Sequence, residues 1–546
     1  MTTAVIDIET NGFKNKATEI HCIVAKCYDT GKIKTWVQEE CEQFGEWSKL
    51  VDTFIMHNGL SFDAPLLNKF TKSNITSDQI RDTLLESQLF NPIREDGHSL
   101  ESWGKRLNFP KGDVDSFDYY TPAMLEYCKQ DVELTYKVAK ELEKESKNFS
   151  KQSIQLEKKI RVILDEQEDN GFTLDIRKAS ELMTTLQDEA DQLIEKAQEI
   201  FPPTEVQLKT KVKYIPFNIG SRKQIAERLM EKGWKPELKT EKGNIIVNEE
   251  VLKTIDIPEA KMFSRYLLLQ KRVAQIKSWI ELCDNNNKVH GKVMTLKTIT
   301  GRMAHHSPNM AQIPAVYSPY GKECRDCWTV ADNINYSLVG TDASGLELRC
   351  LAHYMNDTKF TNELLTGDIH TSNMQMAGLK TRDQAKTFIY AFLYGAGAAK
   401  IGKIVGGDAK KGQQLINRFL SNMSSLRVLR NKVQDASQKG LIRGLDGRLL
   451  YIRSSHSALN TLIQSAGAIV CKYWLIEIMS QIKQTRTDAK LVASIHDEYQ
   501  FEVHNKDLTI FGQIVKEAMT NTQKKLKINC QLDCEWKVGK TWATTH

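Results

Sequence analysis

The sequence predicts a multidomain protein of the α/β class. It has 546 residues, more than a single domain usually contains, and 41% of them are hydrophobic, which is enough to build several cores. Strand-like runs alternate with long runs of helical period near the N-terminus and again in the last part of the chain. No internal repeat or low-complexity segment interrupts this pattern, so we expect several α/β domains in one chain.

The first 150 residues predict strands followed by helices. The runs "TAVIDIET" and "EIHCIVAKCYD" are apolar and β-branched, with a turn signal at Asn11-Gly12 between them. They predict a β-hairpin or two adjacent strands. The run "PAMLEYCKQDVELTYKVAKELEKE" predicts a long amphipathic helix that ends this part of the chain.

The middle of the chain predicts charged helices with one interruption. Residues 151–199 have a helical and strongly charged pattern, which Pro202, Pro203 and Gly220 break. Ser221 is expected to cap the helix that follows it, and "AKMFSRYLLLQKRVAQIKSWIELC" predicts another long helix. After the polar loop "DNNNK", strands and helices alternate to the C-terminus.

The net charge of +6 is unevenly distributed. Residues 1–150 hold 18 Lys and Arg against 25 Asp and Glu, a balance of −7, whereas the remaining residues hold 57 against 44, a balance of +13. A basic body suits a polyanionic partner, and an acidic N-terminal part suits a site that collects cations. Charged residues are also the ordinary content of a solvated surface, so the sign alone assigns no function.

Composition also bears on location and on metal binding. The chain opens directly on a strand-like run without a signal peptide, and it has no run of 18 apolar residues, so we expect a cytoplasmic protein that does not bind membranes. The pairs Cys324/Cys327 and Cys530/Cys534 lie too far apart in sequence to predict a zinc site. Reduced, mostly buried thiols are the expectation.

Carboxylates and one tyrosine form the first candidate site. Asp7 and Glu9 lie two residues apart at the end of an apolar strand, so both face the same side of a sheet. Two such carboxylates repel each other unless a cation joins them. Asp63 follows in "HNGLSFD", and Asp131 lies one helical turn after Tyr127 in "YCKQD". A solvated strand edge is the alternative interpretation of the first pair.

The second candidate site combines strand-end acids with a basic helix. Asp342 ends the apolar run "YSLVGTD", and "AKLVASIHDEYQFEV" predicts a hairpin with "HDE", residues 496–498, at its tip. Between them, one predicted helix carries four residues spaced four apart on one side, two basic and then two aromatic: Arg382, Lys386, Tyr390 and Tyr394. The basic side chains suit the phosphates of a nucleoside triphosphate, and an aromatic ring suits its base. An ordinary amphipathic helix, with Phe388, Ile389, Phe392 and Leu393 as its core face, is compatible with the same pattern.

The ordered acidic motifs resemble those of the DEDDy 3′→5′ exonucleases, the proofreading domains of polymerases. "DIET", "HNGLSFD" and "YCKQD" match the three motifs of that family in order. The resemblance implies an RNase H-like domain over residues 1–150 and two Mg²⁺ ions, for which Mn²⁺ can substitute. It implies that Tyr127 positions the attacking water, and that the metals are held by Asp7, Glu9, Asp63 and Asp131. His57 and Asp82 are expected to be supporting residues.

The later motifs resemble motifs A, B and C of family A DNA polymerases, in particular of the phage branch. "DASGLELRCLAHY", "RDQAKTFIYAFLYGAG" and "HDE" carry the likeness, with "TGRMAHHSPNMAQIP" and "HSALNTLIQSAGA". Ala391 departs from the glycine usual in phage relatives. The resemblance implies a right-hand polymerase after the exonuclease: a thumb over 151–300 and a palm over 301–546 with fingers inserted near 360–440. No flap-type 5′ nuclease is expected before the exonuclease.

The resemblance also implies individual roles in DNA synthesis by two-metal catalysis. Asp342 and Asp497 would hold two Mg²⁺ ions, and Glu347 would exclude the ribose 2′-hydroxyl. The implied nucleotide ligands are His370, Arg382, Lys386 and Tyr390. Glu498 and His496 are expected near the primer terminus. Arg302, Asn460 and Gln464 are expected to contact the minor groove of the duplex, whose hydrogen-bond acceptors are common to all base pairs. Tyr394 is a further implied DNA contact.

The implied partners are primer-template DNA and dNTPs, with a phage helicase-primase and a single-stranded DNA-binding protein as candidates. The stretch from Phe201 to Lys213 is too short to fold as a docking module, so we expect that thioredoxin does not bind. Lys209, Lys211 and Lys213 could contact phosphates. Three rival interpretations are a nuclease with a decayed polymerase body, an inactive DNA-binding scaffold and a single-subunit RNA polymerase. The first two lack support because all the acids are present, and Glu347 argues against the third.

Overall fold

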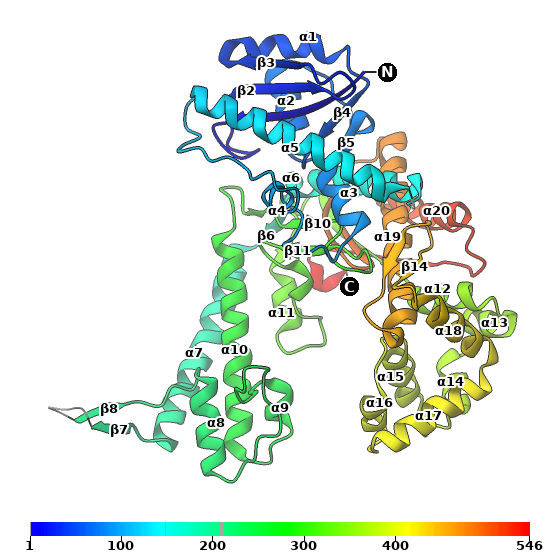
Figure 1. Cartoon of the computed structure of the whole chain (residues 1–546). Helices are drawn as coiled ribbons and strands as arrows, with labels where there is room; N and C mark the ends of the chain where they lie inside the picture. The colour runs from blue at the N-terminus through cyan, green and yellow to red at the C-terminus, as the bar shows by residue number, and fades with distance from the viewer. Residues whose placement is uncertain (1, 148, 208–211, 546) are drawn as a thin grey trace. The chain divides into compact units, whose positions relative to one another are not determined.

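The computed structural model describes residues 2–147, 149–207 and 212–545, and the chain divides into two compact units (Figure 1). The first unit comprises Met1–Asn170, Lys292–His306 and Val339–Lys537. The second comprises Gly171–Gly291, Ser307–Leu338 and Val538–His546. The range 151–300, predicted as a thumb, is thus shared between the units.

The first unit begins with a five-stranded sheet of order β3-β2-β1-β4-β5. Strands β1 to β3 are antiparallel neighbours, and β4 and β5 continue the sheet in parallel to β1, which confirms the predicted RNase H-like arrangement. The bounds are β1 Thr3–Thr10, β2 Ile20–Cys27, β3 Ile33–Val37, β4 Thr53–Met56 and β5 Ile80–Asp82. The predicted pairing of the first two strands is confirmed.

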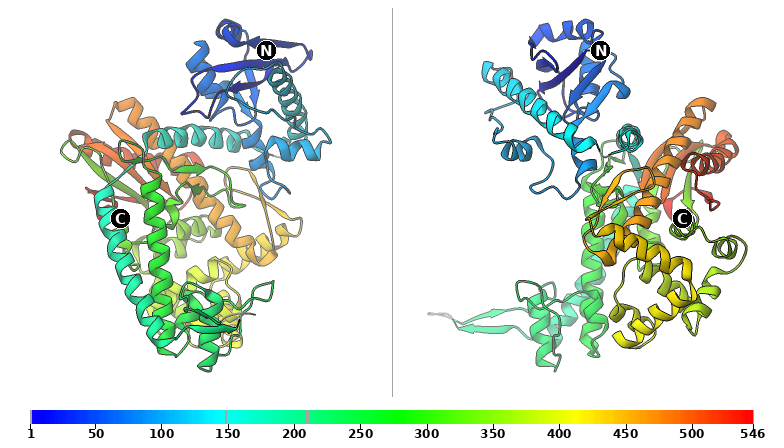
Figure 2. Two further views of the ribbon diagram at one scale, coloured as in Figure 1. Left: turned by 90° about the vertical axis from the view of Figure 1, so that its left-hand side faces the viewer. Right: turned by 45° about the vertical axis from the view of Figure 1, so that its right-hand side comes forward.

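Helices cover this sheet on both faces. The long helix α5, Pro122–Ser146, packs across β1, β2 and β4, and confirms the predicted helix (Figures 1 and 2). Alternate residues of β1 belong to different cores: Ile6 and Ile8 pack in one core, and Val5 packs in the other with Cys128 of α5. The other helices are α1 Phe44–Ser48, α2 Asp63–Thr71, α3 Thr83–Phe90 and α4 Leu100–Arg106.

Most of a second sheet, of order β16-β17-β13-β18, lies in the C-terminal part of the first unit. Its strands are β13 Tyr336–Ala343, β16 Ala489–Ile495, β17 Glu498–His504 and β18 Cys534–Gly539. Helix α19, Ala458–Thr485, makes its most extensive helix contacts with α6 Lys151–Asn170, α12 Leu346–Met355 and α20 Leu508–Leu526. The segment Ser455–Thr485 is long and apolar enough to cross a membrane, but 78% of its most apolar window is buried. We therefore interpret α19 as a core helix.

Six consecutive helices occupy the range predicted for the fingers. Their bounds are α13 Thr358–Thr366, α14 Ile369–Ala377, α15 Arg382–Leu393, α16 Ala398–Ile404, α17 Ala409–Asn422 and α18 Ser424–Ser437. The hairpin of β14 Leu441–Arg443 and β15 Leu449–Tyr451 follows. The predicted core face of α15 is confirmed, because Phe388, Ile389, Phe392 and Leu393 are all buried.

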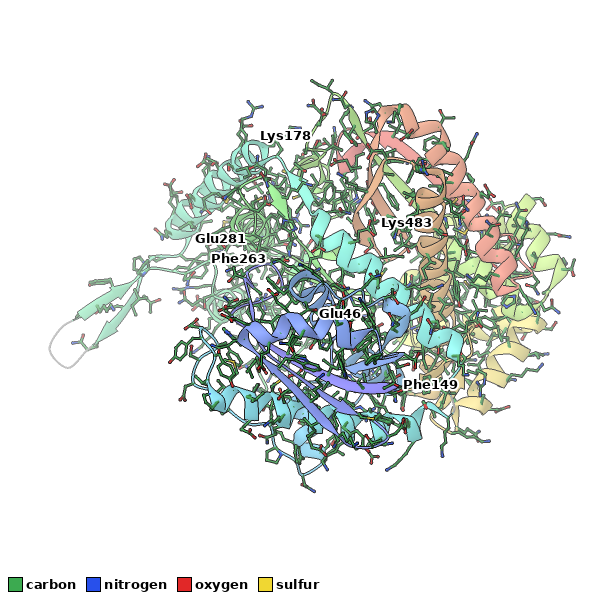
Figure 3. All side chains as sticks on the ribbon, turned by 90° about the horizontal axis from the view of Figure 1, so that it is seen from above. Glu46, Phe149, Lys178, Phe263, Glu281 and Lys483 are labelled. Atoms are coloured by element: carbon green, nitrogen blue, oxygen red, sulfur yellow. The ribbon has the colours of Figure 1, made fainter. Side chains whose placement is uncertain are left out.

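Two long helices, α7 Ile176–Ile200 and α10 Pro258–Glu281, run side by side in the second unit (Figures 1 and 2). The ring of Phe263, labelled in Figure 3, packs 5.8 Å from that of Phe201 and 5.7 Å from that of Phe217, measured between centroids. The other elements are α8 Arg222–Glu231, α9 Glu249–Lys253, α11 Gly321–Asp326 and the strands β6 Phe172–Leu174, β9 Lys288–Val289 and β12 Trp328–Thr329. Ser221 caps α8 by accepting the Gln224 N–H, as predicted.

The stretch expected to be too short for a docking module forms a hairpin. Strand β7, Thr204–Gln207, pairs antiparallel with β8, Val212–Ile215. Lys213 is exposed on β8, whereas Lys209 and Lys211 lie outside the described residues. All eleven cysteines are free thiols and nine are buried, which agrees with the predicted reduced state.

Candidate functional site

The first site is a pocket on the face of the N-terminal sheet that α5 covers. Because β1 alternates its side chains, Asp7 and Glu9 point to the same side as Val5, which packs on α5. Asp63 is the first residue of α2, and α5 supplies the remaining predicted residues. The structure therefore brings together all five predicted residues in one pocket: Asp7, Glu9, Asp63, Tyr127 and Asp131.

Burial and mutual repulsion disfavour negative charge in this pocket. Burial raises the pKa of Asp7 well above its usual range, and the charges of Glu9 and Asp63 raise it further. Burial, with the charge of Asp131 as the next cause, raises the pKa of Glu9 to about 8. Burial also raises the pKa of Asp63 to about 7. A bound cation would reverse these shifts by stabilising the ionised carboxylates.

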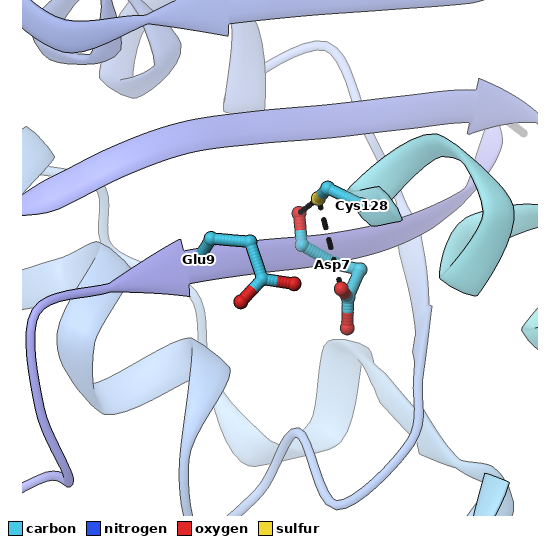
Figure 4. A group of neighbouring side chains, drawn as sticks. All are labelled: Asp7, Glu9 and Cys128. Carbon is cyan, nitrogen blue, oxygen red and sulfur yellow. Dashed lines mark hydrogen bonds between the residues drawn. The ribbon is translucent and has the colours of Figure 1, made fainter. Parts of the chain in front are cut away.

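The chemistry of the pocket fits Mg²⁺. Oδ1 of Asp131 is buried and has no hydrogen-bond partner among the described residues, while its Oδ2 lies 2.8 Å from Nζ of Lys111. Cys128 donates its thiol hydrogen to the Asp7 carbonyl oxygen at 3.4 Å and to Oδ2 at 3.6 Å (Figure 4). Burial raises the pKa of Cys128 well above its usual range, so the thiol stays protonated. Carboxylate oxygens are thus the available ligands, and Mg²⁺ prefers them.

Tyr127 lies at the side of the pocket and contacts a lysine that the motifs did not include. Its ring lies 4.9 Å from Nζ of Lys111 and meets Phe117 edge-on at 6.0 Å. Burial raises the pKa of Tyr127, which keeps its hydroxyl protonated at neutral pH. Lys111 therefore contacts both a predicted metal ligand and the tyrosine predicted to position water.

The two supporting residues differ in what they do. Asp82 caps α3 and accepts four backbone N–H groups, two of them from Asn58 and Leu60, so it shapes the loop before Asp63. His57 lines the pocket and bonds Thr83 Oγ1 at 2.9 Å through Nδ1. Its Nε2 is buried without a partner among the residues that the structure describes. Burial lowers the pKa of His57 to about 3, so the ring is neutral.

Three basic side chains of this pocket were missed by the sequence analysis. Lys111 and His98 come from loops between the second and third motifs, and Lys297 comes from a distant part of the first unit. Nothing in the spacing of the acidic motifs points to them. Only the fold brings them to the pocket.

The second site lies where β13 ends beside the start of β17. The Ala343 N–H donates to the Asp497 carbonyl at 3.1 Å, so Asp342 and Asp497 lie on adjacent strand ends. Burial raises the pKa of Cys471 well above its usual range, and both of these carboxylates add to the effect, which places them near one thiol. The predicted convergence of motifs A and C is therefore present in the fold.

Glu347 holds two of the predicted DNA ligands. Its carboxylate lies 2.9 Å from Nη2 of Arg302 and accepts the Tyr394 hydroxyl at 2.8 Å. Arg302, Glu347, His496 and Asp497 line one pocket. His496 adopts a left-handed backbone conformation, with φ of 57°, at the tip between β16 and β17. The bonds from Glu347 to Arg302 and to Tyr394 were not foreseen from the sequence.

The predicted nucleotide ligands gather around α15. The rings of His370 and Tyr390 lie 6.2 Å apart, and Nδ1 of His370 is buried without a hydrogen-bond partner among the described residues. Arg382 pairs with Asp368 at 2.8 Å, and Lys386 is exposed one turn along the helix. Burial lowers the pKa of His370, followed in effect by these two cations. The group offers several donors on one surface.

Helix α19 carries the remaining predicted DNA contacts. Asn460 and Gln464 are one turn apart, and Ala468 of the pocket follows one turn later, so all three share a helix face. Glu498, at the start of β17, is buried and accepts a hydrogen bond from Gln500 at 2.7 Å. Asn460 and Gln464 therefore lie on the helix face that carries Ala468 of the pocket, and Glu498 is buried next to Asp497 in sequence.

A fully buried charge network, which we call the Glu157 network, lies beneath this pocket. Glu157 of α6 contacts Lys472 of α19 at 2.7 Å and Arg448 at 2.8 Å, and Arg448 also pairs with Asp446 at 2.7 Å. Burial lowers the pKa of Lys472 to about 8. The network joins elements about 300 residues apart in sequence, and no motif predicted it.

Comparison with known proteins gives one consistent family. The family "DNA polymerase family A" matches residues 180–544. The DNA-directed DNA polymerase of Escherichia phage T7 is 30% identical over 99% of this chain and 100% of its own length, and that of Enterobacteria phage T3 is also 30% identical with the same coverage. The T7 alignment runs over 705 positions, so at least 159 of them have no counterpart in these 546 residues.

One solved structure shares the fold across nearly the whole chain. It is described as the POL domain of Pol1 from M. smegmatis in complex with DNA primer-template and dNTP. The match has a TM-score of 0.82 at 19% identity and covers 99% of this chain and 96% of that one. The predicted fold class is confirmed by this likeness.

Proposed function

The chain belongs to DNA polymerase family A, and from this premise we propose that its template-directed DNA synthesis is accompanied by 3′→5′ proofreading in a separate site. One observation carries the proposal: the fold holds two separate pockets that are lined or flanked by carboxylates. One gathers four carboxylates from residues 1–150, and the other lies beside Asp342 and Asp497. The domain division into exonuclease, thumb, palm and fingers is part of the proposal.

In the synthetic site, Asp342 and Asp497 would hold two Mg²⁺ ions. When bound, such ions lower the pKa of the primer 3′-hydroxyl and neutralise charge on the triphosphate and on the leaving pyrophosphate. The primer 3′-oxygen attacks the α-phosphorus of the dNTP, and the bond to pyrophosphate breaks. Polymerases of this family use divalent metal ions, generally Mg²⁺.

The incoming nucleotide lies along α15. Arg382, Lys386 and His370 bind its phosphates, and for this Arg382 exchanges Asp368 for the triphosphate. Tyr390 lies beside the sugar and base. Glu347, fixed by Arg302 and Tyr394, crowds the position of a 2′-hydroxyl.

The duplex lies against the face of α19. Asn460 and Gln464, with Arg302, contact the minor groove, where acceptors are common to all base pairs. His496 and Glu498 lie near the primer terminus, and Tyr394 near the template base. These contacts test the shape of a base pair without reading its sequence.

In the proofreading site, the four carboxylates would hold two Mg²⁺ ions, and the chemistry these ions would supply is activation of a water and stabilisation of the leaving 3′-oxygen. Tyr127 positions that water through its protonated hydroxyl. The water oxygen attacks the terminal phosphodiester, the bond to the 3′-oxygen breaks, and a nucleoside 5′-monophosphate leaves. The single-stranded end of a mispaired primer is the substrate.

The proposed partners are primer-template DNA and dNTPs, which the similar M. smegmatis structure contains. A phage helicase-primase and a single-stranded DNA-binding protein are further proposed partners, and the infected host cytoplasm is the proposed location, because the two similar polymerases are from phages.

Thioredoxin is not among the proposed partners. Between α7 and α8 the described chain forms only the β7–β8 hairpin, and a docking module needs dozens of residues to bury a core. We predict that thioredoxin leaves the product length of single-turnover extension on a long primed template unchanged in the presence of a DNA trap. A large thioredoxin-dependent increase would contradict this assignment. Low salt should lengthen products, because a few phosphate contacts are sensitive to salt.

Primer extension on a defined template tests the function as a whole. Extension with dNTPs but not with NTPs supports a DNA polymerase, and removal of a mispaired 3′ end before extension supports proofreading. Degradation without synthesis would indicate a nuclease with a decayed polymerase body. Binding without either activity would indicate a scaffold.

A further inference from the structure

Lys297 brings a cation to the proofreading pocket from outside the exonuclease motifs. It lies in the loop between β10 Lys292–Met294 and β11 Ala304–His306, 166 residues after Asp131, and lines the same pocket. Its side chain is exposed and forms no ion pair among the described residues. Its charge reaches the pocket wall: burial lowers the pKa of His98 to about 4, and Arg94, Arg106 and Lys297 contribute to that shift.

The backbone that carries Lys297 is fixed by packing. Leu296 is buried in the hydrophobic core of residues 1–150, and the Thr295 carbonyl accepts a hydrogen bond from Lys472 at 2.9 Å. On the other side, Gly301 packs so closely on Arg448 that an added Cβ would lie 2.8 Å from Nη1. The loop is therefore held in place on both sides of Lys297.

The charge balance of the pocket indicates a role for Lys297. Metal ions held by the four carboxylates can neutralise the phosphate that is cleaved, but a single strand carries a further phosphate at every nucleotide. Those phosphates enter a pocket whose own acids repel them. Lys111 already pairs with Asp131, so Lys297 is the lysine of this pocket whose charge is still available.

We infer that Lys297 binds a backbone phosphate of the single-stranded 3′ end upstream of the cleaved bond, an inference that rests on the proposed proofreading function. Arg302 follows five residues later and lines the synthetic pocket, with its Cα at most about 18 Å from that of Lys297. One short segment therefore supplies a cation to each site. A primer end that leaves the synthetic pocket meets Lys297 on entering the other.

The test uses the full chain with Lys297→Met, which keeps the length of the side chain and removes its charge. Lys292→Met is the matched control, because Lys292 lies in the same segment, is 54% exposed and lines neither pocket. Degradation of a single-stranded oligonucleotide is measured over a range of salt concentrations. Lys297→Met should raise KM several-fold with little change in kcat, and should reduce the slope of log KM against log salt by about 0.7. Lys297→Arg should restore both values.

A series of oligonucleotides, each with one neutral methylphosphonate linkage, locates the contact. One linkage should raise KM for the wild-type protein and have no effect on Lys297→Met. If the wild type degrades the strand but Lys297→Met and Lys292→Met have the same KM and the same salt dependence, the inference about Lys297 is wrong and the proofreading function still stands. A wild type that degrades nothing with Mg²⁺ or Mn²⁺ would instead overturn the proofreading function. If Lys297→Met loses extension of a matched primer as much as it loses degradation of the single strand, Lys297 belongs to the synthetic site.

Discussion

In the proofreading pocket four carboxylates face one another with one paired lysine, whereas in the synthetic pocket Glu347 is already bonded to Arg302 and Tyr394. The first arrangement is electrostatically unfavourable without a cation, and the raised pKa values of Asp7 and Glu9 express that cost. The second is satisfied by side chains from three separate elements. The first pocket therefore favours a bound cation, whereas a substrate that enters the second pocket must rearrange contacts that already exist.

The largest expected effect separates the two sites. Asp7→Ala with Glu9→Ala should reduce removal of a mispaired 3′ end by about a thousandfold or more, because metal ligands contribute several kcal/mol to the transition state. Extension should stay nearly intact. Asp342→Asn should have the opposite pattern. Both activities are measured on one labelled primer, with matched and mispaired ends, and loss of both activities in either variant would break the two-site comparison.

A smaller effect is expected at the sugar gate. Glu347→Ala should raise ribonucleotide incorporation relative to dNTPs by on the order of a hundredfold, because the side chain that crowds the 2′-hydroxyl is gone. Glu347→Gln is the matched control, since it keeps the bulk and loses the charge. Single-nucleotide kcat/KM values for dNTP and NTP measure the ratio. Unchanged selectivity in Glu347→Ala would show that another residue is the gate.

A further prediction for the synthetic site concerns Tyr390 and the acceptance of dideoxynucleotides. Its hydroxyl can replace a contact that a missing 3′-hydroxyl would have made, so the wild type should accept ddNTPs readily. Tyr390→Phe should accept them about tenfold less well, which corresponds to one hydrogen bond. Chain termination at equal ddNTP and dNTP concentrations measures this effect. Equal termination by the two proteins would contradict it.

The smallest effect concerns stability and pH in the proofreading pocket. A carboxyl group whose pKa is raised in the folded protein stabilises the fold at low pH, and this stabilisation is lost as the pH rises through the pKa of the folded state. For Glu9 the loss extends from about pH 4 to about pH 8. In EDTA, the melting temperature should therefore fall over this range. Mg²⁺ should restore it at pH 8 and much less at pH 5, where binding must displace protons.

Glu9→Gln should weaken this pH dependence. Glu126→Gln is the control, because Glu126 lies on the exposed side of α5, where its side chain is 71% exposed. Identical pH profiles for Glu9→Gln and the wild type would show that Glu9 is not the group responsible.

Local periodicity explains what the sequence analysis predicted correctly. The pairing of β1 with β2 and the length of α5 follow from patterns within about 25 residues, so the placement of Asp7 and Glu9 on one strand and of Asp131 on a long helix could be anticipated. The same holds for the hairpin of β16 and β17 that carries Asp497. In each case the chemistry-bearing residue lies inside the element that positions it.

Contacts between distant segments explain what was missed. Lys111, Lys297 and the bond between Glu347 and Tyr394 depend on how the elements pack, and a single sequence contains no periodic signal for such packing. The β7–β8 hairpin was missed for a different reason, because its strands are four residues long and mostly exposed. Short exposed strands lack the alternating hydrophobic pattern on which strand prediction depends.

The Glu157 network limits where the chain can be truncated without loss of stability. A polymerase fragment designed to begin at Gly171, the first residue of the second unit, would lose α6 and leave Lys472 and Arg448 without Glu157. An uncompensated buried charge destabilises a fold by about 3–5 kcal/mol, a large share of the stability of a typical domain. Ser150 also donates to the Asp446 carbonyl at 2.5 Å. An engineered exonuclease-free enzyme should therefore begin before Ser150, so that α6 stays with the part that synthesises DNA.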